Sequence, residues 1–243
     1  MAFTERVHAF IAARFHTRLT ETFGERGRKA FVHGTQYYAE QRGRRMGQRA
    51  IRDGMELDYP TYLQYGEWVN TPEIIEEGIA NRREPVAISP DYTLHIHCCP
   101  WHTQFKEMGL IEAGHDYCEH LDNSICRGFN PYITYLVPQT LHKSEYCIHC
   151  IKNAGIEAGK AYPKKQEYLK PFEYHCAHSY WSFSEVTEAI FGAEGREITA
   201  AVLADITAEY GKEMADTLMK YKGVNFSAQR SISPLSAFSR SSI

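Results

Sequence analysis

Cysteine and histidine side chains gather in the segment 92–102, which reads YTLHIHCCPWH. Thiolates are strong nucleophiles and imidazoles exchange protons near neutral pH, so this segment is the expected chemical centre of the chain. Alternation along a strand would put His95, His97 and Cys99 on one face and Cys98 on the other, among aliphatic residues. The neighbouring imidazoles would then activate Cys99 rather than Cys98. The sequence therefore predicts Cys99 as a nucleophile.

Acid–base partners for Cys99 are expected on both sides of it in the chain. His102 falls in the first turn of the following helix, and either His102 or His97 would accept the thiol proton. Further along, Cys118 and Asp122 stand four residues apart, so a helix places them on one face. Asp122 would act as a general acid or base, or would hold an amino or amidine group of a substrate. The predicted catalytic residues are Cys99, His102, His97 and Asp122.

A metal centre is the alternative use of these side chains, because cysteine and histidine are ligands that zinc and iron prefer. Cys147 and His149 share a face of a later strand by the same alternation, although the spacings argue against a simple zinc finger. We expect no cofactor, with zinc or iron as the alternative. The candidate metal ligands are His95, His97, Cys99, Cys118, Cys147 and His149. The run 175–178, reading HCAH, is a further cluster to which the sequence assigns no role.

The order of predicted elements indicates an α+β fold. Antiparallel strand pairs with helices between them predict a small sheet of about four strands, covered by helices and flanked by N-terminal and C-terminal helical segments. The predicted helices are 3–22, 26–50, 72–80, 101–108, 111–126 and 198–222, and the predicted strands are 85–89, 92–98, 132–137 and 145–151. The predicted divisions are a helical segment 1–84, an α+β core with the Cys/His site 85–170, a helical segment 171–225 and a Ser-rich tail 226–243.

Composition indicates a globular protein that acts on a small molecule. Of the 243 residues, 43% are hydrophobic and 23% charged, and a net charge of -3 gives no electrostatic footprint for nucleic acid. No stretch reaches the ~18 apolar residues of a membrane span, and the N-terminus lacks the apolar core of a secretory signal. We therefore expect a cytoplasmic homo-oligomer with a small heterocyclic substrate and with no nucleic-acid or membrane partner. The basic run 42–52 is expected to be a solvated helix face, with one arginine reaching a substrate carboxylate as the alternative.

A series of short motifs stands in order between residues 38 and 150. They are Arg42-Gly43, Cys99-Pro100, FKEMGL from Phe105, Cys118 with Asp122, GFNP from Gly128, Thr140-Leu141 and Cys147. In this order they resemble the L-2-amino-thiazoline-4-carboxylic acid hydrolase family. The resemblance implies a hydrolase acting on C–N bonds, which opens a small cyclic amidine to a carbamoyl-cysteine in amino-acid metabolism. It also implies substrate-binding roles for Cys118, Asn130, Thr140 and Arg42.

Three functions stay open on the sequence. In the first, the Cys99 thiolate attacks the amidine carbon, a histidine accepts the thiol proton, and Asp122 holds the amidinium and protonates the departing ring atom. In the second, a zinc or iron ion at the Cys/His cluster acts on a small heterocycle. In the third, the chain is a binding domain that senses a small molecule or a metal.

Overall fold

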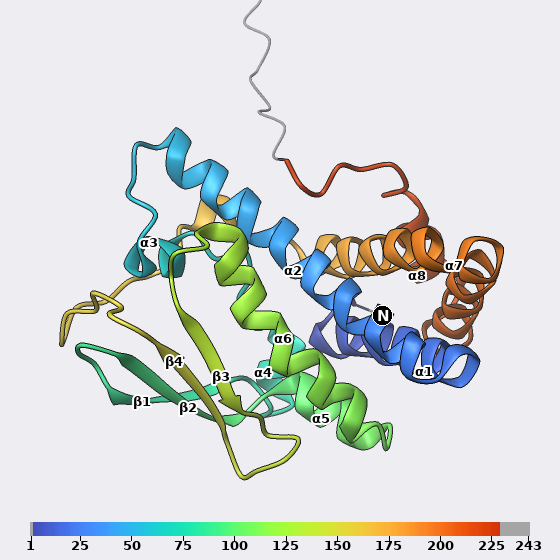
Figure 1. Cartoon of the computed structure of the whole chain (residues 1–243), viewed down its shortest axis with the longest axis horizontal. Coiled ribbons are helices and arrows are strands. Elements are labelled where there is room, and N and C mark those ends of the chain that lie inside the picture. Colours follow the sequence, from blue (N-terminus) through green and yellow to red (C-terminus); the bar gives the residue numbers. More distant parts are fainter. Residues whose placement is uncertain (1, 229–243) are drawn as a thin grey trace, which may run out of the picture.

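The computed structural model describes residues 2–228, in which eight α-helices and one four-stranded antiparallel sheet confirm the α+β expectation. Figure 1 shows the sheet at one end of the molecule, with α2 and α6 between it and the remaining long helices. In chain order the elements are α1 (Glu5–Phe23), α2 (Glu25–Arg52), α3 (Tyr59–Gln64), α4 (Pro72–Glu76), β1 (Arg82–Ala87), β2 (Tyr92–Cys98), α5 (Pro100–Glu107), α6 (Ile111–Phe129), β3 (Tyr135–Gln139), β4 (Cys147–Ile151), the 3-10 helix η1 (Gln166–Tyr168), α7 (Phe172–Tyr210) and α8 (Lys212–Met219).

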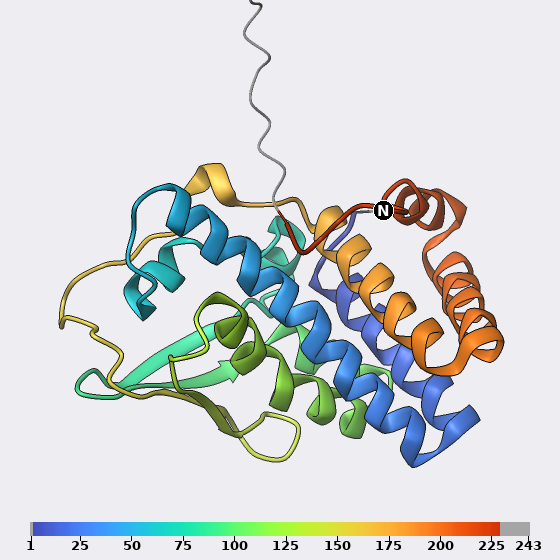
Figure 2. The ribbon, with the colours of Figure 1, turned by 45° about the horizontal axis from the view of Figure 1, so that its top comes forward.

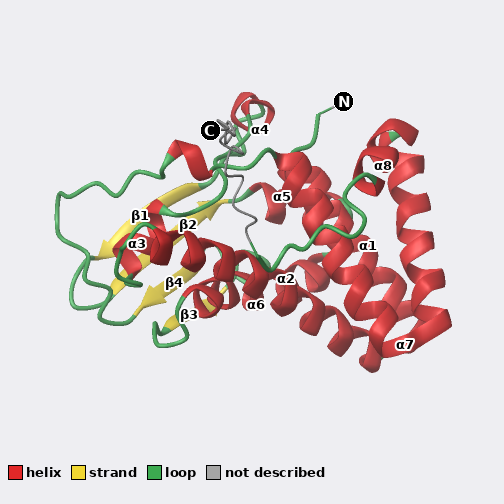
Figure 3. Cartoon of the chain, turned by 90° about the horizontal axis from the view of Figure 1, so that it is seen from above, coloured by secondary structure: helices red, strands yellow, loops and turns green. Residues whose placement is uncertain are grey.

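The sheet has the strand order β1-β2-β4-β3. In the pairing of β2 with β4, Leu94 is opposite His149 and Ile96 is opposite Cys147. Residues directly opposite in an antiparallel pair point to the same face, so one face of the sheet carries these four side chains. Figure 3 shows this sheet beside α2 and α6, with α1, α7 and α8 on the far side of α2. None of the helices described is long and apolar enough to cross a membrane.

Two glycines allow α2 and α6 to pack backbone against backbone. A Cβ atom on Gly43 would lie 1.9 Å from the carbonyl oxygen of Ile125, and one on Gly128 would lie 2.4 Å from that of Glu40. No side chain larger than hydrogen fits at either position without moving a helix. Gly43 weakens the helix propensity of α2 and Gly128 that of α6, but both are needed for the crossing of the two helices.

The largest hydrophobic core lies among α1, α2, α5, α6 and α7, which Figure 2 shows packed side by side. Phe31 of α2 stacks on Phe183 of α7, with ring centroids 5.2 Å apart, and Phe15 of α1 stacks on the same ring. Phe105 of α5 and Tyr117 of α6 are fully buried in the same cluster. Helices that precede and follow the sheet in sequence thus share one core.

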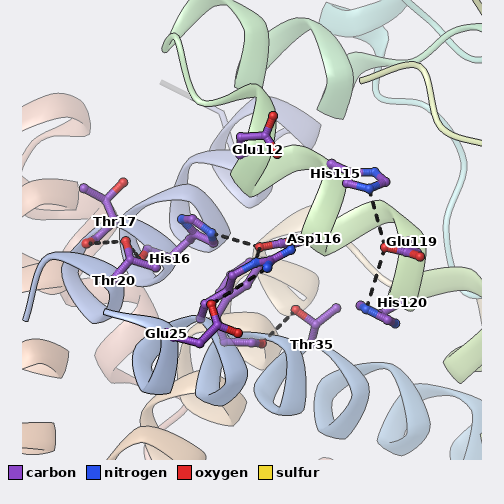
Figure 4. A network of polar contacts seen from close by, with 12 residues as sticks. His16, Thr17, Thr20, Glu25, Thr35, Glu112, His115, Asp116, Glu119 and His120 are labelled. Carbon is purple, nitrogen blue, oxygen red and sulfur yellow. Dashed lines mark hydrogen bonds and ion pairs between the residues drawn. The ribbon is translucent and has the colours of Figure 1, made fainter. Parts of the chain in front are cut away.

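A buried carboxylate joins three helices on the side of α6 away from the sheet. Asp116 accepts two hydrogen bonds of 2.7 Å from Arg28 of α2, and lies 3.2 Å from Nε2 of His16 of α1 (Figure 4). The two hydrogen bonds to one guanidinium hold the carboxylate ionised. Asp116 therefore pins α6 to α1 and α2.

The C-terminal helices differ from the expected single helix 198–222. Gly211, at φ 88°, ends α7 and begins α8, and Gly192, at φ 61°, bends α7 itself. Left-handed backbone at these two points accounts for the breaks, because glycine adopts it without steric cost. Of the predicted tail 226–243, the structure describes 226–228: Ser227 accepts hydrogen bonds from Gln41 and Gln48 of α2. The remainder, 229–243, lies outside the described residues.

Candidate active site

A cavity of about 130 Å³ lies between the sheet and the helices α2, α5 and α6. Leu94 and Ile96 of β2 form part of its floor, and Arg42 of α2 and Asp122 of α6 reach it from the helical side. Aromatic rings from several elements complete its wall. They are Tyr38, Tyr59, Tyr62, Trp68, Trp101, Tyr135 and Phe172. A largely apolar wall with few polar groups is typical of a small-molecule site.

Cysteines from three different elements line this cavity. Cys99 precedes the first residue of α5, Cys118 lies in α6 and Cys147 lies in β4. Burial raises the pKa of all three thiols, to about 12 for Cys147, whose sulfur also accepts a hydrogen bond of 3.1 Å from the backbone N–H of Leu141. The fold therefore brings these three thiols to one cavity, and at rest they are protonated.

Cys99 differs from the other two thiols because it stands at a helix N-terminus. Burial raises its pKa, whereas the backbone N–H groups of His102 and Trp101 and the side chain of Asn81 oppose that shift by favouring the thiolate. Free N–H groups and the helix dipole both favour negative charge at this point. Cys99 is thus the cavity thiol whose anion a helix N-terminus supports.

His95 and His97 lie on the opposite face of the sheet from the cavity, so the predicted face shared with Cys99 is wrong. The ring of His95 stacks on Tyr146 with centroids 4.2 Å apart, and Nε2 of His97 is 2.9 Å from the carboxylate of exposed Glu84. The reason is a β-bulge. Arg82 pairs with Cys98 while Arg83 pairs with Ile96, so one extra residue of β2 resets the alternation before Cys99.

His102 is turned toward another histidine rather than toward Cys99. Its Nδ1 lies 3.3 Å from Nδ1 of His142, and Nε2 of His142 lies 3.4 Å from the sulfur of Cys118. Burial, followed by the charges of His102, His115 and Lys143, lowers the pKa of His142 to about 3, so this ring is neutral. Sequence reasoning missed His142, although it follows Thr140-Leu141, a motif of the family resemblance.

Asp122 stands one helical turn after Cys118 and faces the cavity. Within residues 2–228 it makes no hydrogen bond or ion pair, whereas its charge raises the pKa of Cys118, Cys147 and His149 after the effects of burial and other groups. A carboxyl group beside an apolar wall is costly to leave without a polar partner. Asp122 is therefore available to a cationic ligand.

Arg42, Arg45 and Arg49 of α2 are buried, so the expectation of a solvated basic face is wrong for them. Burial alone would raise the pKa of fully buried Glu67, but hydrogen bonds and charge from Arg45 and the charges of Arg49 and Arg42 hold it far below its usual range. Arg45 and Arg49 bond Glu67 at 2.7 and 2.8 Å. Arg42 faces the cavity, and its buried Nε has no hydrogen-bond partner among the described residues.

Lys164 is a second cavity group that sequence reasoning missed. It lies in the loop between β4 and η1, where no periodic pattern gives it a position. Its ammonium group donates to the carbonyl of Trp68 and stands 4.8 Å from the centre of that ring. Burial and then the charges of Arg83 and Arg42 lower the pKa of Lys164 to about 7. Lys164, Arg42 and Arg83 thus place basic side chains in the cavity wall.

Asn130 and Thr140 do not line the cavity. The amide of Asn130 donates to the carbonyl of Leu57 at 2.6 Å and its oxygen accepts from the N–H of Tyr132, so Asn130 holds the chain after α6. Thr140 is buried, with its hydroxyl 3.0 Å from Nδ1 of His115. The structure therefore gives both residues a supporting position rather than a place at the substrate.

The expected alignment of Cys147 with His149 on one face is confirmed, and both line the cavity. His149 lies 2.7 Å from the hydroxyl of Tyr135. Among the residues described, no group of three or more His, Cys, Asp or Glu side chains has an arrangement that would hold a metal ion. In the cluster 175–178, His175 lines the cavity and donates to the carbonyl of Glu67, and His178 lies 2.9 Å from Oε1 of Gln41.

Comparison with known families gives a match over residues 4–150, more than half of the chain, to L-2-amino-thiazoline-4-carboxylic acid hydrolase. The match begins at α1, ends in β4 and includes every cavity thiol. The protein thus belongs to a class of hydrolases, and its family is that of the L-2-amino-thiazoline-4-carboxylic acid hydrolases. No curated protein and no solved structure matches the chain.

Proposed function

We propose that this chain hydrolyses a small cyclic amidine that carries a carboxylate, with 2-amino-thiazoline-4-carboxylate as the substrate. The observation that carries the proposal is the joint presence of three thiols, Asp122 and Arg42 on one small cavity. A cavity of about 130 Å³ is close to the ~150 Å³ that accommodates one benzene-sized ring. The site therefore suits a single five-membered ring with short substituents.

Two charged groups would orient such a ring. The guanidinium of Arg42 has a buried Nε without a hydrogen-bond partner in the described residues, which suits it to bind a substrate carboxylate. The carboxylate of Asp122 would pair with the amidinium, whose two nitrogens present parallel N–H donors. Opposite charges at two positions fix both the place and the direction of the ring, which is what attack at one carbon requires.

Cys99 is the proposed nucleophile. The neutral amidine takes the thiol proton and becomes the amidinium that Asp122 holds. The sulfur of Cys99 bonds to the amidine carbon to give a tetrahedral adduct beside the N–H groups of Trp101 and His102. The ring sulfur then leaves as a thiol, and the substrate remains bound to Cys99 as an S-amidino group. Water adds to the same carbon, and Cys99 departs as the carbamoyl product forms.

The atoms of the product show which bond of the ring must break, and it is not the C–N bond that the family resemblance implied. A carbamoyl-cysteine retains both nitrogens of the amidine on the carbon that water attacks. The bond that breaks is therefore the one between this carbon and the ring sulfur, rather than a C–N bond. The free thiol released in the product is a direct marker of this step.

The test is incubation of the purified chain with 2-amino-thiazoline-4-carboxylate, followed by mass spectrometry of the products and titration of new thiol. We expect a carbamoyl-cysteine and one thiol for each molecule consumed. The matched control substrate is 2-amino-thiazoline without the carboxylate, which cannot bond to Arg42 and is expected to react far more slowly. Equal rates on both compounds, or release of ammonia in place of a thiol, would contradict the proposal.

A further inference from the structure

Cys118 is the one cavity thiol with an imidazole within hydrogen-bonding distance, among the described residues. Nε2 of His142 lies 3.4 Å from its sulfur, and Nδ1 of His142 lies 3.3 Å from Nδ1 of His102. Cys118 lines the cavity, whereas neither histidine does. Cys118, His142 and His102 thus form a hydrogen-bonded triad. It begins at the cavity and continues behind the cavity wall.

The contact between the two histidines restricts where their protons are. A hydrogen bond between two Nδ1 atoms requires a proton on one and a lone pair on the other. If His102 donates from Nδ1, then His142 accepts at Nδ1 and carries its own proton on Nε2. This Nε2–H then donates to the sulfur of Cys118 and leaves the S–H bond free to point into the cavity. Both rings are neutral in this arrangement.

We propose that Cys118 is the general acid of the reaction and that His142, fixed by His102, is the positioning residue that stabilises its thiolate. This inference rests on the proposed function. It names the proton donor for the first half of the reaction, which ends when the ring sulfur leaves. Cys118 gives its S–H proton to the ring sulfur as the bond between that sulfur and the amidine carbon breaks. The attacking water later returns one proton to the Cys118 thiolate while its oxygen bonds to carbon. The site recovers its starting state with no net proton gained.

The protonation states of the three residues in the triad agree with this role. Burial lowers the pKa of His142 and of His102, so both imidazoles are neutral donors rather than cations. Burial, with Cys99, Cys147 and Asp122 as neighbours, raises the pKa of Cys118, so its proton is present when the substrate binds. A thiol matched in chemical type to the departing thiolate is a suitable donor. The charged or titratable groups that face the hydrogen-bonded triad are Lys106 of α5, His115 and Asp122 of α6, Cys99, Lys143 and Cys147.

The first experiment needs no substrate. The rate at which iodoacetamide alkylates Cys118 is measured against pH by peptide mass spectrometry in the full chain, in His142→Phe and in His142→Gln. Phe cannot donate a hydrogen bond, so we expect alkylation at pH 8 to slow by about tenfold or more and its pH profile to move upward. Gln keeps an N–H donor and is expected to remain within about threefold of the unaltered chain. Alkylation of Cys147, whose sulfur accepts a hydrogen bond from Leu141 rather than from His142, serves as the internal control.

The second experiment measures turnover. Cys118→Ala and His142→Phe are expected to lower kcat by about tenfold or more while KM stays within about twofold, with His142→Gln restoring most of kcat. An unchanged alkylation profile in His142→Phe would show that His142 does not donate a hydrogen bond to Cys118 and would overturn the triad. A Cys118→Ala enzyme with full kcat overturns the general-acid role. If the unaltered chain does not consume the thiazoline, the proposed function fails and the catalytic role of Cys118 fails with it. The alkylation experiment still decides whether the hydrogen-bonded triad exists.

Discussion

Nε of Arg42 lies 3.9 Å from Oε2 of Glu67, although both side chains are buried and two neighbouring arginines bond Glu67 at 2.7 and 2.8 Å. Arg45 and Arg49 hydrogen-bond Glu67, whereas Arg42 pairs with it only through charge and leaves its buried Nε without a hydrogen-bond partner among the described residues. In the proposed function, this Nε is the group that binds the substrate carboxylate.

Replacing Arg42 by glutamine should therefore weaken substrate binding. A charge-assisted hydrogen bond contributes ~1.5–3 kcal/mol, which corresponds to a rise in KM of about 10- to 100-fold. Steady-state kinetics on 2-amino-thiazoline-4-carboxylate measures this rise, and Arg44→Gln, an exposed position on the same helix, is the matched control. Equal KM values for the two variants would show that Arg42 does not bind the carboxylate.

Replacing Glu67 by glutamine should destabilise the fold. The change leaves Arg45 and Arg49 buried without a counter-charge, which costs about 3–5 kcal/mol in the free energy of unfolding. Glu77→Gln removes an exposed partner of Arg6 and should cost at most about 1 kcal/mol. Urea denaturation of both variants provides the comparison, and a loss below about 1 kcal/mol for Glu67→Gln would contradict the assignment.

Stability should depend on acid pH through Asp116. Burial alone would raise the pKa of this carboxyl, but Arg28 and His16 lower it in the folded chain. A depressed folded-state pKa stabilises the protein above the unfolded value of about 3.9, and this contribution is lost as pH falls through the folded value. Asp116→Asn should therefore cost about 1–3 kcal/mol at pH 7 and progressively less below pH 4. A difference between the two proteins that stays constant from pH 7 to pH 2 would rule out this linkage.

The sequence predicted the α+β class and the four strands because strand alternation and helical spacing are local properties. The alignment of Cys147 with His149 followed from the same alternation, and β4 is regular at that point. In β2 the same reasoning grouped Cys99 with His95 and His97, since a bulge opposite Arg82 depends on pairing with another strand. Pairing with another strand, rather than the local sequence pattern, therefore determines the direction of the Cys99 side chain.

Other parts of the site carried no local signal. His142 and Lys164 lie in loops, where neither helical nor strand periodicity indicates a facing direction. Arg42, Arg45 and Arg49 resembled a solvated helix face, because the sequence does not show that Glu67, from a distant loop, neutralises them. Buried charge networks of this kind are visible only when both partners are placed in space.

Turnover of 2-amino-thiazoline-4-carboxylate by Cys99→Ala, compared with Cys98→Ala, tests the central claim most directly. The two cysteines are adjacent, but Cys99 lines the cavity and Cys98 does not, so the pair separates nucleophilic attack from a local packing effect. With Cys99 as the nucleophile, Cys99→Ala should lose on the order of 10³-fold or more in kcat while Cys98→Ala keeps most of its activity. Full turnover by Cys99→Ala would contradict the mechanism.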